Sequence, residues 1–373
     1  MIIQNTTAMT YQPSRRRFVR NLSLGLGGAL LSHPLLAACS PREKKLGIAL
    51  VGLGSYAGGQ LAPALQETKN CYLAGIVTGT PAKEKIWADK YNIPQKNIYN
   101  YQDFDSIADN PDIDIVYVVL PVFLHKEYTI RAAKAGKHVI CEKPMALSVA
   151  ECDEMISACK QANRLLSIGY RLHFEPFNKE MMRLGQQKVY GPVTAIHSSN
   201  GFVYGGTDNS AWRLKKKLAG GGPLMDMGVY VVQGARYVTG EEPLWVKARQ
   251  EKTRPEFFTE VEETVYWQMA FPGGCIANCK TSYNENASIL HADAPKGWFE
   301  ISPAYGYGGL AGKTSQGPMP FPHITQQAAQ MDAFATAVRT STPSIVPGEE
   351  GRKDMKVIEA IYRSLDSGQQ EKV

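Results

Sequence analysis

The sequence lacks a cysteine pattern that would define a disulfide scaffold or a zinc site. Of its 7 cysteines, Cys152 and Cys159 lie about 10 Å apart along an expected helix, too far for a bridge. Cys275 and Cys279 lie farther apart still, on an expected strand. No histidine cluster accompanies the cysteines. We therefore expect neither a disulfide framework nor a bound metal.

The sequence also lacks a large excess of charge of one sign outside its N-terminal segment. The net charge is +6, but four arginines lie in the first 38 residues, which contain no acidic residue. These are Arg15, Arg16, Arg17 and Arg20, and without them the charge is +2. A near-neutral chain has no electrostatic footprint for nucleic acid, so we expect no nucleic-acid partner. The 373 residues are enough for two domains.

The N-terminal segment has no apolar run strong enough to remain in a membrane as a helix. Leu22 to Ala38 is glycine-rich and is broken by a histidine and a proline. It follows Ser14–Arg20, which resembles a twin-arginine export signal, and it ends in a lipobox-like stretch closed by Cys39. We expect residues 1–38 to direct the folded protein to the periplasm, with Cys39 as the candidate for a lipid anchor. The alternative is an uncleaved leader.

A buried strand and a glycine-rich turn begin the rest of the chain. Leu46–Val51 is a continuous apolar run, as in a strand buried on both faces. Gly52–Ala57 follows it as G-x-G-x-x-A. Its glycines let the backbone approach a pyrophosphate, and a helix from about Ser55 to Thr68 would direct its N-terminal N–H groups at the phosphates. This order predicts dinucleotide binding.

The second strand, Tyr72–Val77, ends without an acidic residue. An Asp or Glu at this place would bind the ribose hydroxyls of NAD. This chain has Thr78-Gly79-Thr80 instead, with Lys83 one helical turn farther on. Hydroxyl groups and a cation suit the 2′-phosphate of NADP, so the sequence favours NADP. The alternative for Lys83 is a solvated helix position.

Strands and helices alternate as far as Ile168. Ile113–Leu120 is a buried strand closed by Pro121, and His125 begins the next helix, where a hydrogen bond to backbone is the alternative to a binding role. Lys137–Cys141 is a strand that ends in Glu142-Lys143-Pro144, at the carboxyl edge where ligands bind in such sheets. We predict an α/β fold whose residues 45–168 form a Rossmann dinucleotide-binding domain with a doubly wound parallel sheet.

After Tyr170-Arg171 the apolar residues alternate with polar ones. This pattern predicts a C-terminal α+β domain, residues 169–373, with a large, mostly antiparallel open sheet covered on one face. The free face is a candidate for packing against a second subunit. The expected strands are Val193–Ser199, Leu244–Glu251, Thr264–Phe271, Cys275–Tyr283 and Gly297–Ile301. We also expect helices at Thr325–Arg339 and Arg352–Asp366. They should pack in the core rather than carry chemistry, because Met331 and Phe334 are spaced as core residues.

A glycine loop at 220–222 leads into a further helix. Asp226 and Tyr230 are four residues apart and hence share one face of that helix. The alternative is an acidic helix start followed by a core tyrosine.

These motifs, in this order, resemble those of the Gfo/Idh/MocA oxidoreductase family and its glucose–fructose subgroup. The resemblance runs from about Lys45 to Asp366 and departs from the family pattern at Val122, where an asparagine is common. The subgroup's long arm between export signal and first strand is nearly absent. The matching motifs are Val51–Gly54, Cys141–Pro144, Ile168–Arg171, Trp212–Leu214, Leu218–Gly222, Asp226–Tyr230 and Gly348–Gly351.

The resemblance implies roles for individual residues. Lys143 would contact the substrate hydroxyl and the nicotinamide ribose, Asp226 would position a sugar, and Tyr230 would be the acid/base. Lysine near Tyr230 would favour its phenolate form. The residues expected to bind the cofactor are Gly52, Gly54, Ser55, Tyr56, Thr78, Lys83, Leu120, Pro121, His125, Glu142, Lys143, Arg171, Trp212 and Arg213.

The expected reaction is NADP-dependent oxidation of an aldose at C1 to its lactone. Outside the cytoplasm little free NADP is available, so we expect a tightly bound cofactor that a second sugar regenerates in ping-pong fashion. We also expect a homo-oligomer built through the C-terminal sheet. The alternatives are an NAD-dependent glycoside hydrolase of the same fold, which would need an acidic ribose partner, and a non-catalytic nucleotide- or sugar-binding protein.

Overall fold

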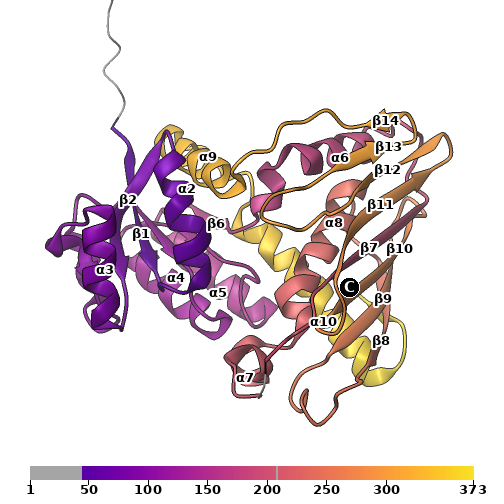
Figure 1. The fold of residues 1–373 in the computed structure, drawn as a ribbon, viewed down its shortest axis with the longest axis horizontal. Helices are drawn as coiled ribbons and strands as arrows, with labels where there is room; N and C mark the ends of the chain where they lie inside the picture. Colours follow the sequence, from indigo (N-terminus) through magenta and orange to yellow (C-terminus); the bar gives the residue numbers. More distant parts are fainter. Residues whose placement is uncertain (1–43, 207–208) are drawn as a thin grey trace, which may run out of the picture. The chain divides into compact units, whose positions relative to one another are not determined.

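The computed structural model describes residues 44–206 and 209–373. The predicted export signal, residues 1–38, and the candidate lipid attachment site Cys39 lie outside the described residues. Within the described part of the chain, no helix is both long and apolar enough to cross a membrane. Residues 44–373 form one unit that contains two sheets (Figure 1).

The first sheet is parallel and six-stranded, with the order β3-β2-β1-β4-β5-β6. The strand order reverses beside β1, as in a doubly wound sheet, so the predicted Rossmann fold is confirmed. Strands β1, β2 and β5 end at the predicted residues, whereas β4 ends at Val118, two residues before the predicted Leu120. The strands are β1 (Leu46–Val51), β2 (Cys71–Val77), β3 (Ile98–Tyr99), β4 (Ile115–Val118), β5 (His138–Cys141) and β6 (Leu166–Ile168).

Helices cover both faces of this sheet. The helix after the glycine turn begins as a π-helical segment, η1, and continues as α2. Short 3₁₀ segments η2, η3 and η4 connect the other elements. The bounds are η1 (Ala57–Leu61), α2 (Ala62–Glu67), α3 (Pro81–Tyr91), η2 (Gln95–Asn97), η3 (Phe104–Asp109), η4 (Val122–Leu124), α4 (His125–Lys134) and α5 (Val149–Gln161).

A helix from the far end of the chain, α9 (Gln326–Thr340), also packs against the Rossmann sheet. Its Met331 and Phe334 are buried in the same cluster as Ile48 and Leu50 of β1, as their core spacing predicted. The core on this side of the sheet is therefore built from both ends of the described chain.

The second sheet has nine strands in the order β14-β13-β12-β11-β7-β10-β9-β8-β15. All neighbours are antiparallel except β7 and β10, which confirms the prediction of a mostly antiparallel sheet. The strands are β7 (Ala195–Gly201), β8 (Trp245–Glu251), β9 (Thr264–Ala270), β10 (Ile276–Ser282), β11 (Ala287–Ala294), β12 (Gly297–Ile301), β13 (Gly312–Thr314), β14 (Gly317–Pro318) and β15 (Glu371–Lys372).

One face of the second sheet is covered by helices (Figure 1). The long α10 packs on β8, and α8 packs on β7 and β10. The helices and short turns of this part are η5 (Arg171–Phe174), α6 (Pro176–Gln186), η6 (Trp212–Leu214), α7 (Lys216–Ala219), η7 (Leu224–Gly228), α8 (Val229–Thr239) and α10 (Gly348–Ser367).

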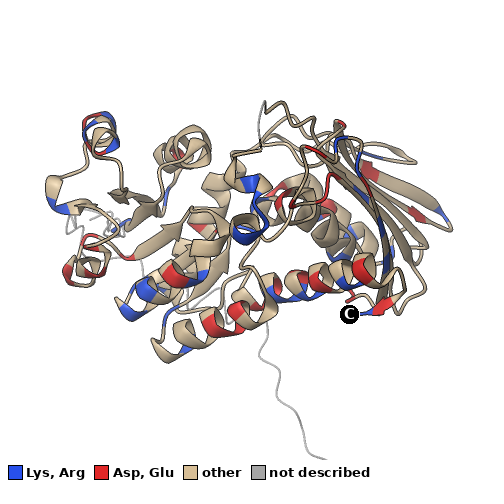
Figure 2. Ribbon diagram, turned by 90° about the horizontal axis from the view of Figure 1, so that it is seen from below, with Lys and Arg blue, Asp and Glu red and all other residues tan. Residues whose placement is uncertain are grey.

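The other face carries polar and aromatic side chains around a shallow depression, among them His197, Arg249, Tyr266, Gln268 and Lys280. Assembly of the chain through this face stays a prediction. Acidic and basic residues are interspersed over the described elements rather than gathered by sign (Figure 2).

Candidate active site

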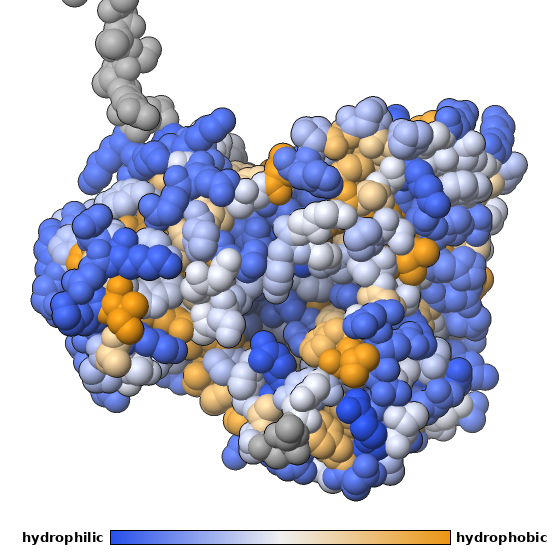
Figure 3. All heavy atoms as spheres, viewed as in Figure 1, coloured by the Kyte–Doolittle hydropathy of each residue, from blue (hydrophilic) through white to orange (hydrophobic). Residues whose placement is uncertain are grey.

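A cavity of about 800 Å³ lies where the carboxyl edge of the Rossmann sheet meets the helices of the second sheet. The surface is hollowed between the two sheets (Figure 3). Segments that follow β1, β2, β4 and β5 form one wall, and residues of η6, η7 and α8 form the other. The predicted residues that border it are Gly52, Gly54, Ser55, Tyr56, Thr78, Lys83, Leu120, Pro121, His125, Glu142, Lys143, Trp212, Arg213, Asp226 and Tyr230.

The glycine turn after β1 has the shape that a dinucleotide pyrophosphate needs. Gly52 has φ +95°, and a Cβ there would lie 2.6 Å from the carbonyl oxygen of Val119, so only glycine fits. A Cβ on Gly54 would meet no heavy atom within 4 Å, and Gly54 borders the cavity. The backbone is therefore open for close approach of a ligand, and Ser55 stands next to it at the start of the following helix.

The end of the cavity beside β2 carries hydroxyl groups and a lysine. Lys83 donates a hydrogen bond from Nζ to the carbonyl oxygen of Leu53 at 2.9 Å, so it reaches back to the glycine turn instead of extending into solvent. Thr78 and Thr80 border the same end. Among the described residues that line the cavity, the only carboxylates are Glu142 and Asp226.

Tyr101 and Gln102 also border this end, and neither was predicted from the sequence. They follow β3, a strand of two residues, which is too short to produce a recognisable apolar period. The signal that could have found them is their place after the neighbouring parallel strand, at the same carboxyl edge as Thr78.

His125 is fully buried and braces two loops at the sheet edge. Its Nε2 lies 2.7 Å from the carbonyl oxygen of Leu120, and its Nδ1 lies 2.9 Å from that of Pro144. Burial lowers the pKa of His125, although the two carbonyl groups oppose the shift. Both ring nitrogens are thus occupied by backbone, which is the alternative that the sequence left open for this residue.

Glu142 borders the cavity and belongs to a buried chain of hydrogen bonds. The Tyr117 hydroxyl donates to Glu142 Oε1 at 2.7 Å, and Gln330 of α9 donates to that hydroxyl oxygen at 2.8 Å. Burial raises the pKa of Glu142, with Tyr117 and Lys143 opposing the rise. A Cβ on Gly169 would lie 2.6 Å from Glu142 Oε1, so glycine in the motif after β6 makes room for the carboxylate.

Lys143 spans the cavity from the Rossmann side to η7. Its Nζ donates to the backbone carbonyl oxygen of Asp226 at 2.6 Å and lies 3.3 Å from Asp226 Oδ1. Burial acts to lower the pKa of Lys143, but Tyr230, Asp226 and Glu142 outweigh it, and the pKa is raised. The amine is therefore a cation at neutral pH.

Asp226 is held as a carboxylate by three neighbours. Besides Lys143, Tyr283 donates its hydroxyl hydrogen to Oδ2 at 3.0 Å, and Arg213 Nε lies 3.6 Å from the same oxygen. Burial alone would raise the pKa of Asp226, but these three groups together lower it. Tyr283 was missed because it directly follows β10 and looks like a core residue; it is buried and yet borders the cavity.

Tyr230 presents its ring to two cations. Lys143 Nζ lies 4.9 Å from the ring centre and the Arg171 guanidinium carbon lies 5.1 Å from it. Tyr230 borders the cavity next to Lys143 and Asp226, so the three residues predicted to be catalytic meet in one place. Their chemical roles stay predictions.

Arg171 departs from its predicted place. It is only 2% exposed and does not border the cavity; it lies behind Tyr230 and Tyr307. Its guanidinium donates to the carbonyl oxygens of Tyr305 and Gly306 and to Gln326. The cause is the turn η5, which begins at Arg171 directly after β6 and points its side chain inward. Trp212 and Arg213 do border the cavity, as predicted.

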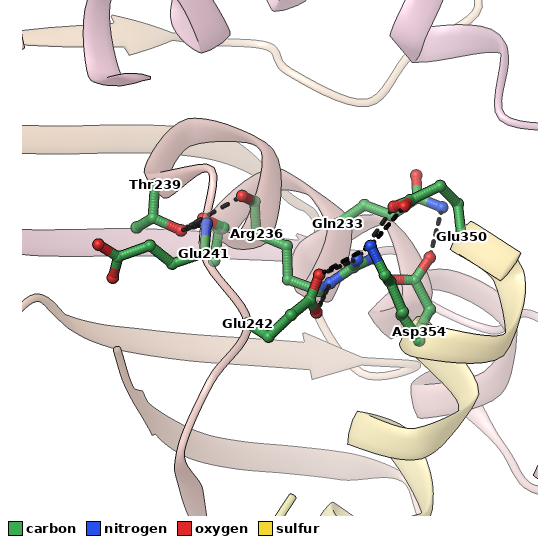
Figure 4. A network of polar contacts seen from close by, with 9 residues as sticks. Gln233, Arg236, Thr239, Glu241, Glu242, Glu350 and Asp354 are labelled. Atoms are coloured by element: carbon green, nitrogen blue, oxygen red, sulfur yellow. Dashed lines mark hydrogen bonds and ion pairs between the residues drawn. The ribbon is translucent and has the colours of Figure 1, made fainter. Parts of the chain in front are cut away.

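Helix α8, which carries Tyr230, is fixed by a buried polar network (Figure 4). Arg236 donates to Glu242 at 2.7 Å, to Glu350 at 2.9 Å and to Asp354, and Gln233 donates to Asp354 at 2.9 Å. Burial raises the pKa of Asp354, while Arg236 opposes the rise. The network joins α8 to the first half of α10, and its residue Gln233 lies one helical turn after Tyr230. The Gly348–Gly351 motif thus has a structural use.

Residues 44–206 and 209–373 contain no group of three or more His, Cys, Asp or Glu side chains placed to hold a metal ion. The six cysteines in this part of the chain are buried and unbridged.

The fold and the cavity define an oxidoreductase with a Rossmann nucleotide-binding domain. Two family models match the chain. One is described as an oxidoreductase family with an NAD-binding Rossmann fold and matches residues 46–170; the other is the GFO/IDH/MocA C-terminal domain and matches residues 179–301. The chain belongs to the Gfo/Idh/MocA oxidoreductase family.

Relatives of known structure or activity agree with this membership. A crystal structure of aldose-aldose oxidoreductase from Caulobacter crescentus complexed with glycerol is 45% identical, has a TM-score of 0.85, and matches over 88% of this chain and 100% of that one. An NADP(+) D-xylose 1-dehydrogenase of Haloarcula marismortui is 26% identical over 328 residues, which are 86% of this chain and 91% of that one. Another from Haloferax volcanii is 27% identical over 332 residues, 87% of this chain and 97% of that one.

Proposed function

We propose that this chain is an NADP-dependent sugar oxidoreductase. It oxidises an aldose at C1 to the lactone, keeps its cofactor bound, and regenerates it by reducing a second sugar. The observation that carries the proposal is the meeting of Lys143, Asp226 and Tyr230 at one end of a cavity whose other end has a dinucleotide turn. The similarity to an aldose-aldose oxidoreductase and to NADP(+) xylose dehydrogenases supports it.

The choice of NADP rests on the cavity end beside β2. A 2′-phosphate would meet the hydroxyl groups of Thr78 and Thr80 and the ammonium of Lys83, which already lies over the glycine turn. No carboxylate from the described residues borders this end, and a carboxylate is what would select the ribose hydroxyls of NAD.

The chemistry divides among the three residues at the other end. NADP, when bound, supplies the acceptor for the hydride that leaves C1. Tyr230 takes the proton of the C1 hydroxyl as the general base, and the Lys143 cation beside its ring stabilises the developing alkoxide. Asp226 is ionised, and its oxygens accept hydrogen bonds from sugar hydroxyls and so orient the ring.

The place of action follows from the N-terminal segment. A twin-arginine signal in residues 1–38 would export the folded enzyme with its cofactor, and a lipid on Cys39 would hold it at the membrane. Because an exported enzyme has little free nucleotide to exchange, retention and internal recycling of the cofactor belong to the same proposal. The outer face of the nine-stranded sheet, around Arg249 and Tyr266, is the proposed surface for homo-oligomer formation.

The nucleotide content of the purified protein tests the proposal. The protein is purified without added nucleotide and denatured, and the supernatant is assayed enzymatically for NADP(H) and NAD(H). Near-stoichiometric NADP(H) is the expected result. Stoichiometric NAD together with sugar release from an aryl glycoside would contradict it and indicate a hydrolase. Absence of both nucleotides would contradict the retained cofactor.

A further inference from the structure

The loop between β12 and β13, residues 302–311, carries Tyr307 near its middle. The loop is attached to the rest of the protein both before and after this residue. Before that residue, the backbone N–H groups of Ala304 and Tyr305 donate to Ser288 Oγ at 2.9 and 3.0 Å, and the Tyr305 side chain is buried. After it, Leu310 is buried. The base of the loop therefore belongs to the core of the second sheet.

Arg171 ties the same loop to the Rossmann side of the cavity. It donates to the carbonyl oxygen of Tyr305 at 2.7 Å and to that of Gly306 at 2.8 Å. Gln326, at the start of α9, donates to the Gly306 carbonyl oxygen at 3.3 Å. These bonds fix the backbone up to the residue before Tyr307, while Arg171 itself is buried and unavailable to a ligand.

Tyr307 stands at the tip of this loop and borders the cavity. Its ring lies 4.5 Å from the Arg171 guanidinium carbon, and its ring centre lies 5.6 Å from that of Tyr56 in the glycine turn. The contact between Tyr307 and Tyr56 therefore joins the β12–β13 loop to the glycine turn, the segment expected to bind the pyrophosphate. Tyr307 lines the same cavity as Lys143 and Tyr230. Burial and the neighbouring Tyr230 raise the pKa of Tyr307, while Lys143 and Arg171 oppose the rise.

The surroundings of Tyr307 suit a cover over the cavity more than a core position. The residue is 51% exposed although its ring contacts two side chains. Gly308 and Gly309 follow it, and a Cβ on either would meet no heavy atom within 4 Å. A large, half-exposed ring between glycines contributes little to the core. We therefore expect the ring to contact a ligand in the cavity.

We infer that Tyr307 covers the nicotinamide end of the bound dinucleotide and slows its release, and that Arg171 is the positioning residue that holds the loop in place. The inference deepens the proposed function and rests on its claim that NADP binds in this cavity. The Tyr307 ring contacts Tyr56 of the glycine turn and Arg171, and it borders the cavity that Lys143 also lines. It would therefore lie against a dinucleotide bound between the glycine turn and Lys143.

The test measures how fast NADPH leaves the full-length protein. Protein loaded with NADPH is mixed with a large excess of NADP⁺, and the loss of bound NADPH fluorescence gives the release rate. We expect Tyr307→Ala to release NADPH about tenfold faster, and Tyr307→Phe, which keeps the ring, to match the wild type. Ile345→Ala is the matched control, because Ile345 is 57% exposed and does not border the cavity.

Arg171→Lys separates positioning from general destabilisation. It should accelerate release as Tyr307→Ala does, and the double variant should release no faster than either single variant, because both changes act on one contact. Thermal unfolding identifies any variant with a damaged fold.

Two results overturn the inference in different ways. A Tyr307→Ala protein that binds NADPH and releases it at the wild-type rate overturns it and leaves the proposed function intact. A wild-type protein that binds no NADP(H) overturns the proposed function and the inference together.

Discussion

Lys143 and Tyr230 face each other at the end of the cavity, with the lysine Nζ 4.9 Å from the centre of the tyrosine ring. The two residues come from different parts of the fold, one from the end of β5 and the other from α8, and Asp226 on the preceding η7 accepts a hydrogen bond from the same amine. This relationship brings a cation, a carboxylate and a phenol together in one part of the cavity.

Replacing Tyr230 by Phe should stop sugar oxidation and leave NADP binding intact. The phenyl ring keeps the packing against Lys143 and Arg171 but cannot take a proton. We expect kcat to fall by at least about a hundredfold, the usual contribution of a general base. Steady-state kinetics and an NADPH titration on the same preparation separate the two effects, and unchanged turnover would refute the assignment.

Replacing Tyr283 by Phe should weaken sugar binding and shift the pH profile. The Tyr283 hydroxyl stabilises the ionised form of Asp226, so its loss raises the pKa of Asp226. Activity requires that carboxylate and falls as the pH drops through its pKa, so the acidic limb of kcat/KM should move to higher pH. The sugar KM should rise about tenfold, as expected for a lost hydrogen bond to a charged group.

Tyr99→Phe is the control for this change. It also removes a buried tyrosine hydroxyl, one that accepts a hydrogen bond from Asn110 at 2.7 Å, outside the cavity. An acidic limb that moves equally in both variants, or in neither, would contradict the role given to Tyr283.

Replacing Lys83 by Ala should weaken the binding of NADP more than that of NAD. The lysine ammonium is the one charged group expected at the 2′-phosphate, and its loss should raise the Kd for NADPH about tenfold to a hundredfold. Lys85→Ala is the control, because Lys85 lies on the same helix but forms an exposed ion pair with Asp89. Equal losses of NADPH and NADH affinity would indicate that Lys83 supports the glycine turn rather than the phosphate.

Replacing Asp354 by Asn should destabilise the fold through the network beside α8. Arg236 is 3% exposed and would keep its positive charge, while its buried partner at position 354 would lose its negative charge. We expect the free energy of unfolding to fall by about 3 kcal/mol, within the range measured for broken buried pairs. Asp153→Asn breaks the exposed pair with Arg352 and should cost under about 1 kcal/mol. Chemical denaturation measures both, and equal losses would contradict the account.

Most of the Rossmann half could be predicted strand by strand, because β1, β2, β4 and β5 are apolar runs that end at a turn or an ionisable pair. The two-residue β3 was missed. The nine-stranded sheet was predicted less completely. Strand β11 (Ala287–Ala294) was missed because only two of its eight residues are buried and it mixes serine, histidine and aspartate with alanine. Its neighbours β7 and β12 define it, and pairing across the sheet does not appear in local sequence.

The residues of the candidate active site were also predicted incompletely. Lys143 and Asp226 stand in motifs whose spacing carries information, and both border the cavity. Tyr283 and Tyr307 carry no local signal, because one directly follows a strand of alternating polar and apolar residues and the other lies in a glycine-rich loop. Arg171 was expected at the cavity wall, and only the structure shows that Tyr230 and Tyr307 stand between it and the ligand space.

A single-turnover reaction tests whether this protein oxidises an aldose with its own bound NADP⁺. Protein that carries NADP⁺ is mixed with one aldose at a time, with no free nucleotide present, while NADPH absorbance and lactone are measured. The account predicts one equivalent of bound NADPH and one of lactone for a suitable aldose, with the NADPH reoxidised when a second, reducible sugar is added. Reduction of no bound NADP⁺ by any aldose, in protein shown to hold the nucleotide, would contradict it.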